Sequence, residues 1–207
     1  MNKTLLLAGV AACLFSANAH AFDATPYVSA KLRYSMLDNE LKMTDDEGYS
    51  LKLNGDDNVF GGSIAVGISS AVKGGAIRAE LEYNKNAKAK DTSYNIIKTE
   101  VETQSTMLNA YYDIDTGTKF TPYVGAGLGF AKVKGTLKVA DVTGSESQYN
   151  FAWQVGAGIG YALNDNVSLD AGYRYVDYGH WTTEDVEETD RLESTAHELY
   201  VGARYAF

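Results

Sequence analysis

The chain ends in Leu199-Tyr200-Val201-Gly202-Ala203-Arg204-Tyr205-Ala206-Phe207, and this segment alternates between two kinds of side chain. Counted back from Phe207, every second residue is apolar or aromatic, whereas the other register carries polar, small and charged residues. A strand with lipid on one side and a polar interior on the other is typical of a transmembrane β-barrel. The pattern recurs along the whole chain and therefore predicts an all-β membrane protein.

Eight segments of the chain show this alternation. They lie at about residues 27–36, 59–69, 77–83, 107–113, 122–130, 151–161, 167–175 and 199–207. An even number of strands closes an antiparallel barrel with both termini on one side of the membrane. We therefore predict an eight-stranded antiparallel up-and-down transmembrane β-barrel.

The connections between these segments alternate in length. Long polar connections follow the first, third, fifth and seventh strands, at about residues 37–58, 85–103, 135–148 and 177–195, and the others are brief. Short turns of outer-membrane barrels are periplasmic and long loops extracellular, so we expect four extracellular loops and periplasmic termini. This orientation predicts two aromatic girdles, an outer one of Tyr34, Phe60, Tyr83, Phe130, Phe151, Trp153, Tyr173 and Tyr175 and an inner one of Tyr112, Tyr161, Tyr205 and Phe207.

The N-terminus has the features of a secretory signal peptide. Lys3 precedes an apolar run, and Asn18-Ala19-His20-Ala21 offers small residues at both cleavage positions. We predict a cleaved signal over residues 1–21 and a barrel domain over residues 22–207; lipid attachment at Cys13 is the alternative. Without Lys3 the formal charge changes from −9 to −10, which argues against a nucleic-acid partner.

Charged residues of both signs fall on the inward register of the predicted strands. An eight-stranded barrel has just enough room inside for side chains, so these groups must meet one another. We predict an ion-pair network that fills the lumen, since unpaired charge there would be costly. Its members are Lys31, Arg33, Arg78, Glu80, Glu82, Asp170, Arg174, Glu198 and Arg204. A narrow gated pore for small solutes is the alternative.

Two motifs carry a resemblance to a known family. Thr121-Pro122-Tyr123-Val124-Gly125-Ala126-Gly127-Leu128-Gly129 and Gly172-Tyr173-Arg174-Tyr175-Val176-Asp177-Tyr178-Gly179, followed by the last strand, resemble the opacity-type outer-membrane surface antigens. That family is similar in architecture to the membrane domain of outer-membrane protein A. The resemblance implies an eight-stranded barrel with variable exposed loops, and some members are adhesins.

Other activities have weaker support in the sequence. A lipid A-modifying enzyme would need a nucleophile beside a histidine, but His180 lies with Thr182, Thr183 and Glu184 in a polar loop, and His197 has no nucleophile in register. The first and fourth loops are acidic without a calcium-loop spacing, and the second carries four lysines. We expect no catalytic residue, cofactor or metal site.

The expected function is that of a monomeric surface protein with an envelope-structural and adhesive role. Its expected partners are outer-membrane lipid and lipopolysaccharide, the outer-membrane insertion machinery and ligands on host surfaces. The aromatic Phe207, with Tyr205 on the same face, is typical of the C-terminal signal that the insertion machinery recognises. A simple girdle role is compatible with this interpretation.

Overall fold

The computed structural model describes residues 24–45, 50–87, 89–93, 97–139, 142–185 and 188–207; the predicted signal peptide lies outside them. Side chains are described over 24–38, 58–87, 103–132, 149–179 and 194–207. The strands are β1 Ala24–Asp45, β2 Ser50–Val72, β3 Gly75–Asn86, β4 Ala89–Ser93, β5 Ile97–Ile114, β6 Phe120–Val139, β7 Val142–Ala162, β8 Val167–Asp185 and β9 Glu188–Ala206. In this part of the chain, no helix has the length and hydropathy needed to cross a bilayer.

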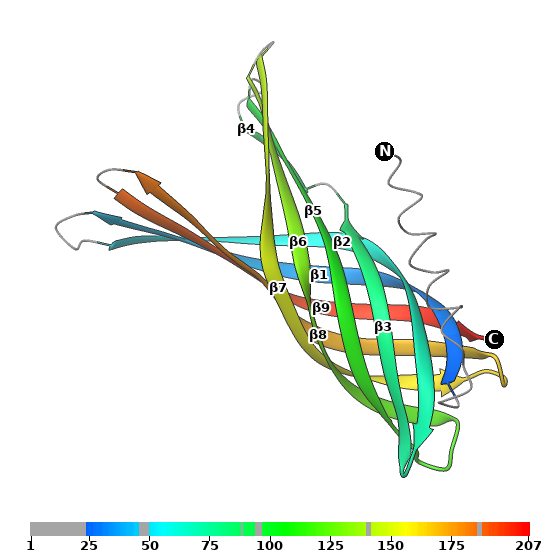
Figure 1. Cartoon of the computed structure of the whole chain (residues 1–207). Coiled ribbons are helices and arrows are strands. Elements are labelled where there is room, and N and C mark those ends of the chain that lie inside the picture. Colours follow the sequence, from blue (N-terminus) through cyan, green and yellow to red (C-terminus); the bar gives the residue numbers. More distant parts are fainter. Residues whose placement is uncertain (1–23, 46–49, 88, 94–96, 140–141, 186–187) are drawn as a thin grey trace.

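Eight of these strands form a closed barrel, as predicted. Each pairs antiparallel with its neighbours in the order β3-β2-β1-β9-β8-β7-β6-β5, and pairing of β3 with β5 closes the ring (Figure 1). The short β4 pairs with β5 beyond the wall. Closure gives every wall strand two partners, which satisfies the backbone polar groups that lipid cannot.

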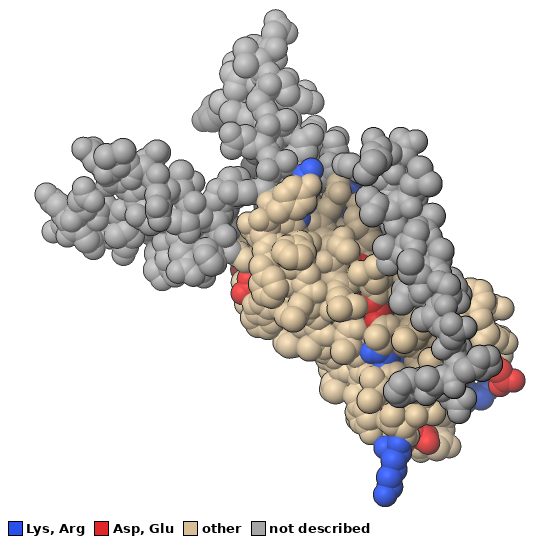
Figure 2. All heavy atoms as spheres, viewed as in Figure 1, with Lys and Arg blue, Asp and Glu red and all other residues tan. Residues whose placement is uncertain are grey.

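The barrel is apolar outside and polar inside. On β1, Leu32 is 72% exposed whereas the next residue, Arg33, is 2% exposed. The same contrast separates Leu199, 50% exposed, from Glu198, 0% exposed. The outer surface in Figure 2 is accordingly mostly uncharged. This confirms the predicted inward and outward registers, because a pleated strand sends successive side chains to opposite faces.

The three short turns lie at the end of the barrel where β1 begins and β9 ends (Figure 1). Lys73 and Gly74 join β2 to β3, and Gly74 adopts a φ of 86°, which glycine tolerates at no steric cost. Asp115 Oδ1 accepts a hydrogen bond from Gly117 N at 2.8 Å in the next turn. Asn164 Oδ1 accepts from Val167 N, also at 2.8 Å, in the third. Such side-chain bonds to the backbone explain the Asx-rich turn sequences.

At the other end the chain extends into two separate β-arms, which corrects the predicted strand ends. Pairing of β2 with β3 stops at Gly61↔Asn86, and pairing of β7 with β8 stops at Trp153↔Asp177. Beyond these seams, β2-β1-β9-β8 continue as one sheet, here called the β1 arm, and β4-β5-β6-β7 continue as another, the β6 arm. Figure 1 shows the two arms diverging from the rim. The four long connections are therefore largely strand rather than loop.

A β-bulge marks the place where β8 leaves the wall. The register between β8 and β9 shifts between Asp177 and His180. Gly179 has a φ of 83°, and its N–H donates to Asp177 Oδ1 at 2.7 Å. Bulges bend a strand and increase its twist, so this one directs β8 from the wall into the β1 arm.

Candidate functional site

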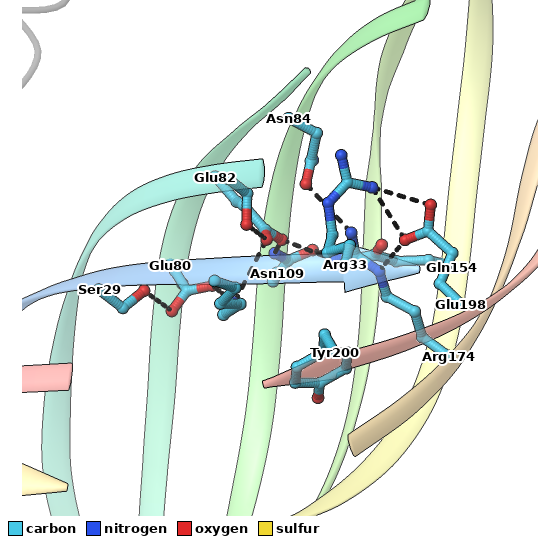
Figure 3. A network of polar contacts seen from close by, with 12 residues as sticks. Ser29, Arg33, Glu80, Glu82, Asn84, Asn109, Gln154, Arg174, Glu198 and Tyr200 are labelled. Carbon is cyan, nitrogen blue, oxygen red and sulfur yellow. Dashed lines mark hydrogen bonds and ion pairs between the residues drawn. The ribbon is translucent and has the colours of Figure 1, made fainter. Parts of the chain in front are cut away.

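The lumen holds the candidate site, and its centre is a cluster of two arginines and two glutamates (Figure 3). Arg174 Nε donates to Glu198 Oε2 at 2.6 Å, and Arg174 Nη1 donates to Glu82 Oε2 at 2.9 Å. Arg33 Nη1 donates to Glu198 Oε1 at 2.8 Å from the other side. All four residues are at most 4% exposed. Charge-assisted bonds of this length are the strong ones, so the cluster ties together four strands.

Lys31 connects this cluster to the next carboxylate along the lumen. Its Nζ lies 2.8 Å from Glu80 Oε1 and 3.3 Å from Glu82 Oε1. Glu80 Oε2 also accepts from the Tyr27 hydroxyl at 3.1 Å. Glu82 therefore bridges the lysine and Arg174.

A second group of ion pairs lies nearer the periplasmic end. The Arg78 guanidinium makes a bidentate contact with Asp113, with Nε–Oδ2 and Nη2–Oδ1 distances of 2.8 Å. Arg204 lies 3.3 Å from Asp170 Oδ1 and 3.7 Å from Asp113 Oδ2. Arg78 also lies 4.5 Å from the centre of the Tyr111 ring. Arginine combines such stacking with forked hydrogen bonding, which suits it to a packed polar interior.

All nine residues predicted for the network lie on the lumen side of the wall, but the prediction omitted one acid. Asp113, placed on the inward register yet left out of the network, is the main partner of Arg78. With it, the described lumen holds five cations and five anions: Lys31, Arg33, Arg78, Arg174 and Arg204 against Glu80, Glu82, Asp113, Asp170 and Glu198. Equal numbers of each sign allow complete pairing.

Neutral polar side chains complete the hydrogen bonding of these charges. Ser35 and Tyr178 donate to Glu198 at 2.7 and 3.0 Å, and Ser63 donates to Glu82 at 2.7 Å. Asn109 donates to Glu82 at 2.9 Å, and Asn84 Oδ1 accepts a hydrogen bond from Arg174 at 3.0 Å. Among the described buried side-chain atoms, Arg33 Nε alone has no partner. The alternation of polar and apolar residues along each strand predicts that these residues face the lumen. It does not predict which of them form hydrogen bonds, because that depends on the curvature of the wall.

Four lumen tyrosines lie opposite glycines on the neighbouring strand. The pairs are Tyr27↔Gly67, Tyr111↔Gly125, Tyr123↔Gly158 and Tyr200↔Gly172. A Cβ atom added to Gly67, Gly158 or Gly172 would lie 2.5 Å from the tyrosine Cζ, and one added to Gly125 would lie closer still to the Tyr111 ring. The rings thus lie over strand positions that carry no side chain, as in the aromatic rescue of glycine.

An apolar layer lies above the charges, toward the arms. Its members are Met107, Ala131, Ala152, Val176, Tyr178 and Ala196, all at most 3% exposed. The sequence did not lead us to expect this layer, because its alanines are spread over three strands. The layer lines the lumen on the side of β5 to β9, with partly buried Leu37 of β1 packed against it.

The candidate catalytic histidines do not form a nucleophilic site in the described residues. His197 lies on the outer wall, where its Nδ1 is 2.5 Å from the Tyr173 hydroxyl and its Nε2 is 3.8 Å from Asp38 Oδ2. The side chain of His180 lies outside the described part. Within that part, no group of three or more acidic, histidine or cysteine residues is arranged to hold a metal ion.

The two residues predicted for the assembly signal lie together on the lipid face at the periplasmic end. The rings of Tyr205 and Phe207 are 5.2 Å apart and meet edge to face. They are 46% and 60% exposed. Phe207 N donates to Pro26 O at 3.1 Å, which ties the terminus to the start of β1.

Comparison with known proteins agrees with this architecture. The family model described as outer membrane protein beta-barrel domain matches residues 5–207. The chain belongs to this family. Opacity protein opA50 of Neisseria gonorrhoeae is 26% identical over 88% of the chain and 97% of its own length. Outer membrane protein PagN of Salmonella typhimurium is 35% identical over 54% of the chain, a match that spans about half of PagN, 52% of its length.

Solved structures of outer-membrane barrels have the same fold. Neisserial surface protein A matches with a TM-score of 0.54 and 24% identity, covering 89% of this chain and 99% of the neisserial one. Ail, the attachment invasion locus protein of Yersinia pestis, matches in its complex with the heparin analogue sucrose octasulfate, with a TM-score of 0.52 and 16% identity over 88% of this chain and 99% of Ail. The protein is thus an outer-membrane β-barrel that is similar to opacity proteins; its short turns lie on the periplasmic side and its arms on the extracellular side, as in other barrels of this kind.

Proposed function

We propose that this protein is a surface adhesin whose two arms bind ligands on host cells while the barrel serves as a sealed anchor. The observation that carries the proposal is the division of the outer region into two β-sheets that project beyond the rim. Paired strands hold an extended surface away from the membrane at a lower entropy cost than mobile loops would. The kinship with opacity proteins supports the same role.

Shortening the arms tests this function. The deletion of residues 40–54 removes the β1–β2 hairpin above the pair Asn39↔Gly55, and deletion of 135–146 shortens the β6–β7 hairpin above Lys134↔Ser147. Both variants keep every wall strand. When they are expressed in a non-adherent Gram-negative host, we expect normal surface levels and at least a tenfold loss of adhesion to epithelial cells for one or both. Full adhesion with both arms shortened together would refute the proposal.

A sealed lumen is part of the proposal, in place of a solute channel. The apolar layer and the balanced ion pairs support it, because an ion that crossed the lumen would have to displace the central cluster of Arg33, Arg174, Glu82 and Glu198, all at most 4% exposed. Recording in planar bilayers checks it: we expect no stepwise conductance from the wild-type protein. Regular open states would favour the small-solute channel.

We also propose that residues 1–21 are a cleaved signal peptide, that Tyr205 and Phe207 form the assembly signal, and that the barrel is a monomer.

We propose, in addition, that the protein is not an enzyme. The pairing of His197 with Tyr173 and Asp38, rather than with a serine or threonine, supports this proposal. Unchanged lipid A mass spectra in cells with and without the protein would be consistent with it, and a protein-dependent loss of an acyl chain would contradict it.

A further inference from the structure

The outer half of β3, β5, β6 and β7 presents three successive rows of side chains to the membrane. Cross-strand pairing aligns each row. The first is Leu81, Leu108, Leu128 and Trp153, the second Tyr83, Thr106, Phe130 and Phe151, and the third Lys85, Gln104, Lys132 and Tyr149. The chemistry of this face, here called the β5–β6 face, changes from aliphatic through aromatic to cationic toward the arms.

Seven of the twelve side chains in these rows are exposed, and the other five, Lys132 among them, are half-buried. Leu108, Leu128 and Phe130 are 59–64% exposed. Phe130 and Phe151 meet edge to face at 6.3 Å, and Lys132 Nζ lies 5.2 Å from the centre of the Tyr149 ring. None of these twelve residues is acidic. The face thus offers apolar area directly below two ammonium groups, whose backbones are two strands, or about 10 Å, apart.

The two sides of the rim differ in charge. The β6 arm above this face, residues 85–106 and 131–149, has seven lysines and five acidic residues in its sequence. The β1 arm, residues 37–58 and 177–195, has fourteen acidic and three basic residues. On the wall below the β1 arm, the lipid-facing positions end in Asp177, Thr195 and Asp38. An anionic head group is therefore attracted to one side of the barrel and repelled from the other.

We propose that the β5–β6 face is a binding site for one lipopolysaccharide molecule of the outer leaflet. Its lipid A phosphates lie against Lys85 and Lys132, and its acyl chains cover the leucine and aromatic rows. An amphiphile with an anionic head is the ligand that uses all three rows, whereas free phosphate would meet only the lysines and a peptide would leave the rows below the rim bare. The inference rests on the outer-membrane location of the barrel and is independent of adhesion.

The test uses the full barrel in phosphatidylcholine nanodiscs, titrated with bisphosphorylated lipid A and with lipid A from which both phosphates have been removed. The variant is Lys85→Gln with Lys132→Gln; the matched control is Lys73→Gln with Lys119→Gln, two exposed lysines of the periplasmic turns. A basic residue beside an anionic membrane surface contributes roughly fivefold to binding, so we expect a loss of roughly 25-fold for the rim pair. The Lys73 and Lys119 control variant tests whether net charge alone affects binding. The dephosphorylated lipid A measures the binding that the acyl chains contribute without phosphates.

Three results would overturn the proposal. The first is equal affinity of the rim variant and the wild type for bisphosphorylated lipid A. The second is an equal loss in the turn variant, which would mean that only net charge matters. The third is displacement of lipid A by millimolar inorganic phosphate, which would assign the lysines to a free anion. A selective loss in the rim variant, absent with the dephosphorylated ligand, is the supporting result.

Discussion

Replacement of Arg174 by methionine probes how the lumen charges stabilise the barrel. Methionine keeps most of the aliphatic volume but removes the guanidinium, which donates to Glu198, Glu82 and Asn84. The five cations of the lumen become four against five anions. Both carboxylates keep other donors, Arg33 and Ser35 for one and Lys31 and Ser63 for the other.

The expected loss follows from these contacts. Removal of one partner from a buried ion pair costs about 3–5 kcal/mol, and the remaining donors place Arg174→Met near the lower end, at about 3 kcal/mol. The additional change Glu82→Gln restores four pairs of opposite sign: Lys31 with Glu80, Arg33 with Glu198, Arg78 with Asp113, and Arg204 with Asp170. The double variant should therefore recover about half of the loss, or about 1.5 kcal/mol.

Equilibrium urea unfolding in lipid vesicles measures these differences, with tryptophan fluorescence and gel mobility as two independent signals. Lys73→Met, at an exposed periplasmic turn, is the control and should change stability by at most about 0.5 kcal/mol. An Arg174→Met protein as stable as this control, or a double variant no more stable than the single one, would refute the argument that charge pairing in the lumen stabilises the fold.

Three further outcomes are expected. Gly172→Ala should lose about 2 kcal/mol in the same unfolding assay, because its Cβ would lie 2.5 Å from Tyr200 Cζ, whereas Gly62→Ala, with 3.6 Å to its nearest neighbour, should stay within about 0.5 kcal/mol; equal losses would contradict the packing argument. The purified protein should migrate differently on a denaturing gel before and after boiling, since a closed barrel has no sheet edge at which to fray, and identical mobility would count against closure. Deletion of Phe207 should cause periplasmic accumulation and proteolysis in cells but near-normal refolding in detergent; normal surface levels would reject the assembly signal.

The barrel wall was predictable because lipid and lumen impose opposite demands on alternate residues. Polarity alone identifies the lipid-facing and lumen-facing residue in neighbouring pairs such as Val28 and Ser29, or Leu199 and Glu198. Above the membrane both faces of a strand meet water, so the alternation fades and the arms were predicted as loops. The bulge at Gly179 was missed for a related reason, since a single glycine in a polar stretch does not reveal a register shift.

The membership of the lumen site was mostly predictable, but its connections were not. The structure pairs Arg174 with Glu198 across β8 and β9 and also with Glu82, while Asp170 pairs with Arg204. Neighbouring positions follow from register, yet contacts across the lumen depend on barrel diameter and strand stagger. Those quantities are properties of the closed ring and are not encoded in any one strand.

The bond between Arg174 and Glu82 has a consequence for how the barrel assembles. Its two strands, β8 and β3, are four pairings apart whichever way the ring is followed, so the bond spans the lumen. A sheet that has not yet closed holds these groups far apart, so this buried ion pair is missing until the ring is complete. Partly closed intermediates are thereby destabilised relative to the complete ring. We expect insertion and closure to occur as one cooperative transition, because the ion pairs across the lumen form only when the ring is complete.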